Sequence, residues 1–170
     1  QKGEIKHFIT YLQNEILSSF SFRDVIQLNE QSLKFLLIMF FKFTSYYEIR
    51  SEQELASSSN EGGYGDLTLV ESTRNDLFPA RDVKFEWLFE LKYMKKNSIK
   101  RTKENAKKRL TKEEIISSPE IKKKMDAAKK QLRGYKKIYE KKYRKSSRIT
   151  QMKYAVILFV GKEFVLHEVV

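Results

Sequence analysis

The chain contains no cysteine and only two histidines, His7 and His167, which lie far apart in the sequence. Without cysteine no disulfide can form, and the two histidines have no ligand-like neighbours, so a zinc site of cysteine and histidine is excluded. Any metal ion must therefore be held by oxygen atoms. The lack of cysteine is typical of a reducing compartment, and we expect a cytoplasmic protein.

Long hydrophobic runs are also missing. The longest, Phe35 to Phe41, has about seven residues and charged lysines at both ends, whereas a membrane-spanning helix needs roughly twenty. No signal peptide is recognisable, so we expect no contact with a membrane. With 41% hydrophobic residues, the chain can form a core, and we expect a single domain over residues 1–170. Because it begins abruptly with Gln1, we expect it to be the C-terminal part of a longer protein.

The net charge of +12 is concentrated in one segment. Between Lys95 and Lys145 there are about 21 Lys and Arg against about 6 acids, so the rest of the chain is slightly acidic. Such a segment favours a polyanionic partner, because neutralised phosphates release condensed counterions. We expect nucleic acid as this partner; the alternative is a pair of helices whose lysines only contact solvent. The lysines expected to bind it are Lys122, Lys123, Lys124, Lys129, Lys130 and Lys136.

Hydrophobic periodicity predicts an alternation of helices and strands. Helices are expected over 5–18, 29–44 and, after a break at Pro119, over 120–143. Strands are expected over 46–50, 66–70, 85–93, 154–160 and 163–169, with a loop over 55–65. A lysine-rich insertion is expected at about 95–118, mobile or helical over 102–117. This order predicts an α/β domain with a mixed central sheet flanked by helices.

The segment from Phe85 to Tyr93 is the clearest strand, because every odd position is apolar. Successive side chains of a strand point to opposite faces, so the even positions, which include Glu90 and Lys92, share one face. The alternative is that this face is simply solvated. In a chain with 33% charged residues, an isolated Glu-x-Lys is a weak signal.

Phosphodiester cleavage gives this pair a chemical use. Cleavage at neutral pH needs an activated water and positive charge near the phosphate, and Mg²⁺ or Mn²⁺ held by one or two carboxylates supplies both. Glu90 can provide one carboxylate, and Asp66, at the start of the preceding predicted strand, can provide another. Leu91 can lend its backbone carbonyl to the same ion.

Several stretches together resemble a known family. They are Asn29-Glu30, Tyr46 to Ile49, Gly63 to Leu67, Phe89 to Tyr93, Ala128 to Tyr135 and Tyr154 to Phe159. In this order the chain resembles a PD-(D/E)XK nuclease-like domain, especially a bacterial family in which such a domain follows an AAA-ATPase-like domain. The resemblance implies a restriction-endonuclease-like fold, metal-dependent hydrolysis of phosphodiester bonds in nucleic acid, and an ATPase-like domain N-terminal to this one.

The resemblance also implies residue roles. Asp66 and Glu90 would be metal ligands, Lys92 would position the water and offset charge, and Glu30 would be an auxiliary acid. The chain departs from the superfamily pattern because no proline precedes Asp66 and because a long lysine-rich insertion follows Lys92. The insertion leaves open whether the site is accessible or active.

Gln131 and Tyr135 are four residues apart on a predicted helix and therefore share a face. They resemble the Gln-x-x-x-Tyr element of RecB-type nucleases, whose helix borders the active site, and we expect both to contact nucleic acid. The alternative is that Tyr135 belongs to the core and Gln131 to the solvated surface.

Two other functions remain compatible with the sequence. One is a non-catalytic nuclease-like domain that binds nucleic acid or a partner, and the other is a regulatory domain attached to an ATPase. The intact set of Asp66, Glu90 and Lys92 favours the nuclease, because a binding surface has no use for two carboxylates next to a phosphate. DNA is the expected nucleic acid, but the choice between DNA and RNA stays open, as do the strandedness of the substrate, endo or exo cleavage, and the oligomeric state.

Overall fold

The computed structural model describes residues 5–21, 23, 28–44, 47–55, 63–71, 85–99, 111–143 and 151–170. They form a five-stranded sheet in the order β1-β2-β3-β4-β5. The strands are β1 (Tyr47–Leu55), β2 (Gly63–Glu71), β3 (Phe85–Met94), β4 (Gln151–Val160) and β5 (Phe164–Val169). The helices are α1 (Lys6–Tyr11), η1 (Leu12–Leu17), α3 (Glu30–Thr44), η2 (Lys96–Ser98), α4 (Lys112–Ser117) and α5 (Pro119–Tyr143). Among these helices, none has the length and hydrophobicity that a membrane crossing requires.

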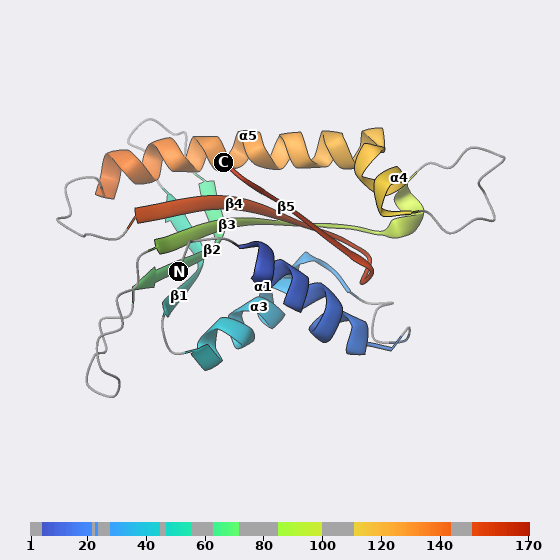
Figure 1. Cartoon of the computed structure of the whole chain (residues 1–170). Helices are drawn as coiled ribbons and strands as arrows, with labels where there is room; N and C mark the ends of the chain where they lie inside the picture. The colour runs from blue at the N-terminus through green and yellow to red at the C-terminus, as the bar shows by residue number, and fades with distance from the viewer. Residues whose placement is uncertain are drawn as a thin grey trace.

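Helices cover both faces of the sheet. The long helix α5 lies along one face, while α1 and α3 lie on the other (Figure 1). Strands β3 and β4 are parallel and all other neighbouring pairs are antiparallel. The prediction of a mixed central sheet flanked by helices is therefore confirmed.

The alternation of β3 divides its residues between two hydrophobic cores. Trp87, Phe89 and Leu91 belong to the core shared with α1 and α3, whereas Leu88 belongs to the core beneath α5. Strand β4 contributes to both cores and is buried over its last seven residues. A strand buried on both faces has a nearly continuous apolar sequence, which explains the composition of β4.

Helix α5 begins where a break was expected. Pro119 is its first residue, a position at which the missing N–H of proline has no helical partner to lose. The hydroxyl of Ser118 accepts a hydrogen bond from the Ile121 amide at 3.4 Å, which caps the first turn. Six buried residues three or four positions apart then form the apolar stripe of the helix: Ile121, Met125, Ala128, Leu132, Tyr135 and Tyr139.

Two predicted boundaries in the first half of the chain were wrong. The strand expected over 46–50 continues to Leu55, and the next strand starts at Gly63, inside the segment expected to be a loop. Leu55 pairs with Gly63, and Gln53 pairs with Gly65. Pairing with a neighbouring strand therefore outweighs the low strand propensity of glycine. As a result Asp66 is the fourth residue of β2 rather than its first.

The other differences concern helices. The segment expected as one helix over 5–18 is α-helical in α1 and π-helical in η1, and hydrophobic spacing does not distinguish these two forms. In the insertion, the helical parts among the described residues are the short 3-10 helix η2 and α4, which begins with a capping box between Thr111 and Glu114. Residues 100–110 of the insertion lie outside the described residues.

Candidate active site

Three carboxylates from three different elements surround the ammonium group of Lys92 on β3. The Nζ atom of Lys92 lies 2.6 Å from Oε1 of Glu90, on the same strand. It lies 3.9 Å from Oδ2 of Asp66 on β2 and 3.6 Å from Oε1 of Glu30 on α3. The structure thus brings together the four residues that the sequence proposed as catalytic.

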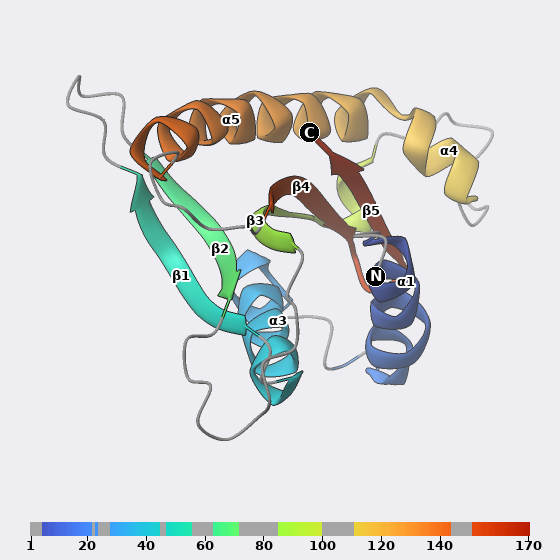
Figure 2. The ribbon, with the colours of Figure 1, turned by 60° about the vertical axis from the view of Figure 1, so that its left-hand side comes forward.

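The end of one strand pairing places Asp66 beside β3. The β2–β3 ladder runs over three residue pairs and ends at Leu67 and Phe89, and beyond it β2 diverges from β3 (Figure 2). In the space that opens, the Leu91 amide donates a 2.8 Å hydrogen bond to Oδ2 of Asp66. The N–H and C=O of one strand residue point to the same side. The Leu91 carbonyl therefore also points to the side of β3 on which Asp66 lies.

Glu30 reaches this site from the opposite layer of the fold. It is the first residue of α3, and Asn29 before it accepts a 2.9 Å hydrogen bond from the Ser32 amide through its side-chain oxygen, as an N-cap residue does. The other carboxylate oxygen of Glu30, Oε2, accepts a 3.3 Å hydrogen bond from the Tyr93 amide. The start of α3 is therefore tied to β3 next to Lys92.

The face of β3 that carries Glu90 is not solvated. Glu90 is 0% exposed and Glu86 is 5% exposed, so the alternative of a solvated strand face is wrong. Apart from the close contact with Lys92, neither carboxylate oxygen of Glu90 has a hydrogen bond of good geometry within the described residues. Burial of a carboxylate that lacks hydrogen-bond partners costs free energy, so the position of Glu90 calls for an explanation.

Burial dominates the proton affinity of these groups. It raises the pKa of Glu90 to about 7, against the opposing effect of Lys92. Burial also raises the pKa of Asp66, although the Leu91 amide and Lys92 oppose it. For Lys92, burial alone would lower the pKa, but the surrounding carboxylates outweigh it, Glu90 most of all, and the pKa is raised. Lys92 is therefore cationic at neutral pH.

The raised pKa of Glu90 predicts a pH-dependent stability in the absence of metal. The folded state holds a proton on Glu90 up to about pH 7, while the unfolded chain releases it near 4.5. Stability from this group is therefore fully present below about pH 4.5 and is lost as the pH rises through 7. In EDTA we expect the unfolding free energy of the wild type, relative to Glu90→Gln, to fall by about 2–3 kcal/mol between pH 5 and 8. Urea denaturation at several pH values measures this difference, and parallel pH profiles for the two proteins would contradict it.

The donor set fits a hard divalent cation. Within the described part of the chain, no three Asp, Glu, His or Cys side chains form a metal-binding group by themselves. Two carboxylates and a backbone carbonyl are nevertheless a sufficient protein contribution for Mg²⁺, which keeps several water ligands. The unsatisfied oxygens of Glu90 are the observation that such an ion would explain. Asp66, Glu90 and the Leu91 carbonyl would hold it.

Helix α5 brings Gln131 and Tyr135 to the border of this site. The Gln131 side-chain amide donates a 2.6 Å hydrogen bond to the Tyr135 hydroxyl. Burial is the main cause that raises the pKa of Tyr135, and the negative charges of Glu90 and Asp66 raise it further. Tyr135 is thus close enough to these two carboxylates to interact with them electrostatically. Tyr135 also packs in the core beneath α5, while Gln131 is exposed. The two residues thus have the burial that the alternative expected, and they also border the site.

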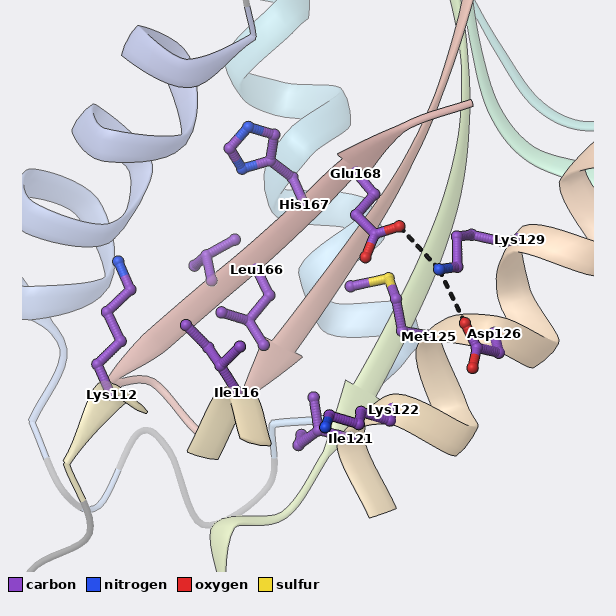
Figure 3. A pocket seen from close by; sticks show the side chains of 11 residues that line it. Lys112, Ile116, Ile121, Lys122, Met125, Asp126, Lys129, Leu166, His167 and Glu168 are labelled. Atoms are coloured by element: carbon purple, nitrogen blue, oxygen red, sulfur yellow. Dashed lines mark ion pairs between the residues drawn. The ribbon is translucent and has the colours of Figure 1, made fainter. Parts of the chain in front are cut away.

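The lysines expected to bind nucleic acid are divided between different sides of α5. Lys122 and Lys129 face β5, where they line a groove of about 470 Å³ between α4, α5 and β5 (Figure 3). Lys129 is held there by Asp126 at 2.8 Å and Glu168 at 2.9 Å. Both lysines are therefore on the flank away from Gln131.

The other expected lysines have separate surroundings. Lys124 donates a 2.7 Å hydrogen bond to the Tyr93 carbonyl, on the flank that borders the site. Lys136 lies over the ring of Tyr154, 5.1 Å from its centroid. Lys123 and Lys130 are exposed. The six residues thus do not form one continuous surface.

Sequence reasoning missed Lys34, one turn after Glu30 on α3. Lys34 lies 2.5 Å from Oε1 of Glu52, and its charge lowers the pKa of Asp66, although less than the Leu91 amide and Lys92 do. The available signal was its spacing of four residues from Glu30, which places the two on one face of the helix.

A comparison with protein-family models matches residues 28–169 to a model described as the PD-(D/E)XK nuclease superfamily. Comparisons with curated proteins and with solved structures gave no match. The matched range includes the whole sheet, Lys92 and the three carboxylates around it. Together with the mixed sheet and its flanking helices, the match confirms the predicted restriction-endonuclease-like fold. The narrower resemblance to a family that follows an ATPase-like domain stays a prediction.

Proposed function

Because the chain belongs to the PD-(D/E)XK nuclease superfamily, we propose that it is a metal-dependent nuclease whose active site is formed by Asp66, Glu90 and Lys92. The observation that carries this proposal is the convergence of carboxylates from β2, β3 and α3 on one partly buried ammonium group. A site that only bound phosphate would gain nothing from acidic groups at this position.

Each residue has a distinct chemical task in this proposal. A bound Mg²⁺ or Mn²⁺ ion would lower the pKa of a water molecule and polarise the phosphate. Asp66 is oriented by the Leu91 amide, which leaves its second oxygen available to the ion. Glu90 is fully buried, and apart from the close contact with Lys92 no hydrogen-bond donor among the described residues competes with an ion for its oxygens.

Lys92 is a cation at the point where the phosphoryl group gains negative charge. Its raised pKa keeps it protonated, so it orients the attacking water and offsets charge in the transition state. Glu30 is a positioning residue, because it binds both Lys92 and the Tyr93 amide. Gln131 and Tyr135 border the site from α5 and would contact the substrate.

We propose DNA as the substrate, and a metal titration of cleavage tests the activity. Labelled single-stranded and double-stranded DNA and RNA are incubated with the protein at increasing Mg²⁺ or Mn²⁺. We expect cleavage that is absent in EDTA and rises to saturation with the metal, and faster cleavage of DNA than of RNA. Binding of nucleic acid without cleavage of any of the four substrates would favour the non-catalytic domain, which could regulate an attached ATPase.

A further inference from the structure

The outward face of α5 carries a row of lysines that the proposed active site does not use. The helix turns by 100° per residue, which places Lys123, Lys130, Lys137 and Lys141 within about 40° of one another, opposite the buried stripe. All four are exposed. We call these four residues the lysine ridge.

Acids in the described part of the chain do not neutralise the lysine ridge. Its members form no ion pair within the described residues, whereas Asp126 pairs with Lys129 on the flank facing β5. Like charges four residues apart, such as Lys137 and Lys141, destabilise an isolated helix. A merely solvated helix face usually intersperses acids among its lysines. The uncompensated ridge indicates a polyanionic partner.

The ridge lies next to the flank of α5 that borders the carboxylates. Helical spacing places Gln131 and Gly134 between the ridge and Tyr135. A Cβ atom on Gly134 would meet no atom within 4 Å, so packing does not require a glycine there. Glycine inside a helix costs about 1 kcal/mol relative to alanine. Because Gly134 has no side chain, the helix surface between the lysine ridge and Gln131 carries no side-chain atoms at this position.

We propose that the lysine ridge holds the phosphate backbone of a single nucleic-acid strand, which crosses α5 at Gly134 to reach Asp66 and Glu90. This proposal rests on the proposed nuclease function. The ridge is one row wide and extends over about 27 Å from Lys123 to Lys141. A single row of separated charges fits one phosphate backbone rather than both backbones of a duplex.

Salt-dependent binding tests the ridge without requiring cleavage. A labelled single-stranded oligonucleotide is titrated with the protein in EDTA at several salt concentrations. In Lys130→Gln/Lys137→Gln we expect the slope of log affinity against log salt to flatten by about 1.4 units, at about 0.7 per phosphate of a single strand. Lys42→Gln/Lys112→Gln is the matched control, because it removes the same charge from exposed lysines on α3 and α4. Its slope should stay close to that of the wild type.

Variants at Gly134 separate a steric effect from a charge effect. Gly134→Ala should raise the melting temperature by about 2–4 °C, because nothing in the fold needs the glycine. Gly134→Gln should lower the affinity at every salt concentration and leave the salt slope unchanged, since it blocks the crossing without removing a cation. An unchanged affinity in Gly134→Gln would contradict the crossing at this residue.

The outcomes distinguish this proposal from the nuclease proposal. Equal slopes in the ridge variant and its control, or no binding by the wild type, would overturn the lysine ridge. A flattened slope in a protein that never cleaves would keep the ridge and reject the nuclease. Cleavage by the wild type together with equal slopes in the ridge variant and its control would keep the nuclease and reject the ridge.

Discussion

Glu90→Gln is expected to abolish divalent-ion binding and to reduce cleavage by at least about 10³-fold, since a catalytic metal contributes several kcal/mol to the barrier. The amide is isosteric with the carboxylate but neutral. It removes the most deeply buried negative charge of the site, where Glu90 contacts Lys92. Asp66→Asn should have the same consequence, because it removes the other proposed side-chain ligand. Isothermal titration calorimetry with Mg²⁺ or Mn²⁺ and a cleavage assay measure the two effects.

Glu86→Gln is the matched control for this prediction. Glu86 lies on the same strand and the same face as Glu90 and is also buried, but it is not among the carboxylates that pair with Lys92. Metal affinity and cleavage should remain close to those of the wild type in this variant. Equal losses in Glu86→Gln and Glu90→Gln would mean that both changes act through folding, and unchanged metal affinity in Glu90→Gln would remove the site from this residue.

Lys92→Ala is expected to reduce turnover by about 10²–10³-fold while changing nucleic-acid affinity only slightly. The charge of Lys92 acts mainly on the transition state, where the phosphoryl group becomes more negative. Loss of the ammonium also removes a cation from among three carboxylates. Divalent-ion affinity should therefore stay the same or increase in this variant. Single-turnover cleavage, binding in EDTA and calorimetry separate the three quantities.

Lys95→Ala controls for the loss of one positive charge in the same part of the chain. Lys95 follows β3 directly and is exposed, so its removal should change neither turnover nor metal affinity. If Lys92→Ala cleaves normally but binds nucleic acid poorly, Lys92 is a phosphate contact like any other lysine. That result would favour the non-catalytic binding domain.

The part of the site that lies on β3 was predictable from the sequence alone. Because side chains alternate between the two faces of a strand, Glu90 and Lys92 share one face of Phe85–Met94 in any fold that makes this segment a strand. The burial of that face was not predictable, because it depends on α5, which follows after the lysine-rich insertion and packs over β3 and β4. The same charged pair was therefore equally compatible with a solvated strand.

The positions of Asp66 and Glu30 depended on the resemblance rather than on a local pattern. Asp66 reaches Leu91 because the β2–β3 ladder stops after three pairs, and no local sequence signal marks where a ladder ends. Glu30 was recognisable as a first-turn acid of α3. Its contact with Tyr93 joins residues far apart in the chain, and hydrophobic periodicity does not specify such contacts.

The basic segment shows the limit of counting charge. Composition indicated a polyanion partner, but it treated all lysines between Lys95 and Lys145 alike. The tertiary structure separates them, because Lys129 is neutralised by Asp126 and Glu168 beside β5. Lys130, the next residue, is exposed and has no ion pair with any residue that the structure describes. Whether a lysine of α5 can bind a phosphate therefore depends on the face of the helix that carries it and on whether that face lies next to β5.

The position of a bound metal ion decides whether Asp66 and Glu90 form a metal site. Crystals of the protein soaked with Mn²⁺ give an anomalous signal that locates the ion independently of any assumed role. We expect one peak between the carboxylates of Asp66 and Glu90 and next to the Leu91 carbonyl, and no peak at this place in Glu90→Gln crystals. An ion bound elsewhere, or none at millimolar Mn²⁺ in the wild type, would contradict a metal-dependent nuclease site built from these residues.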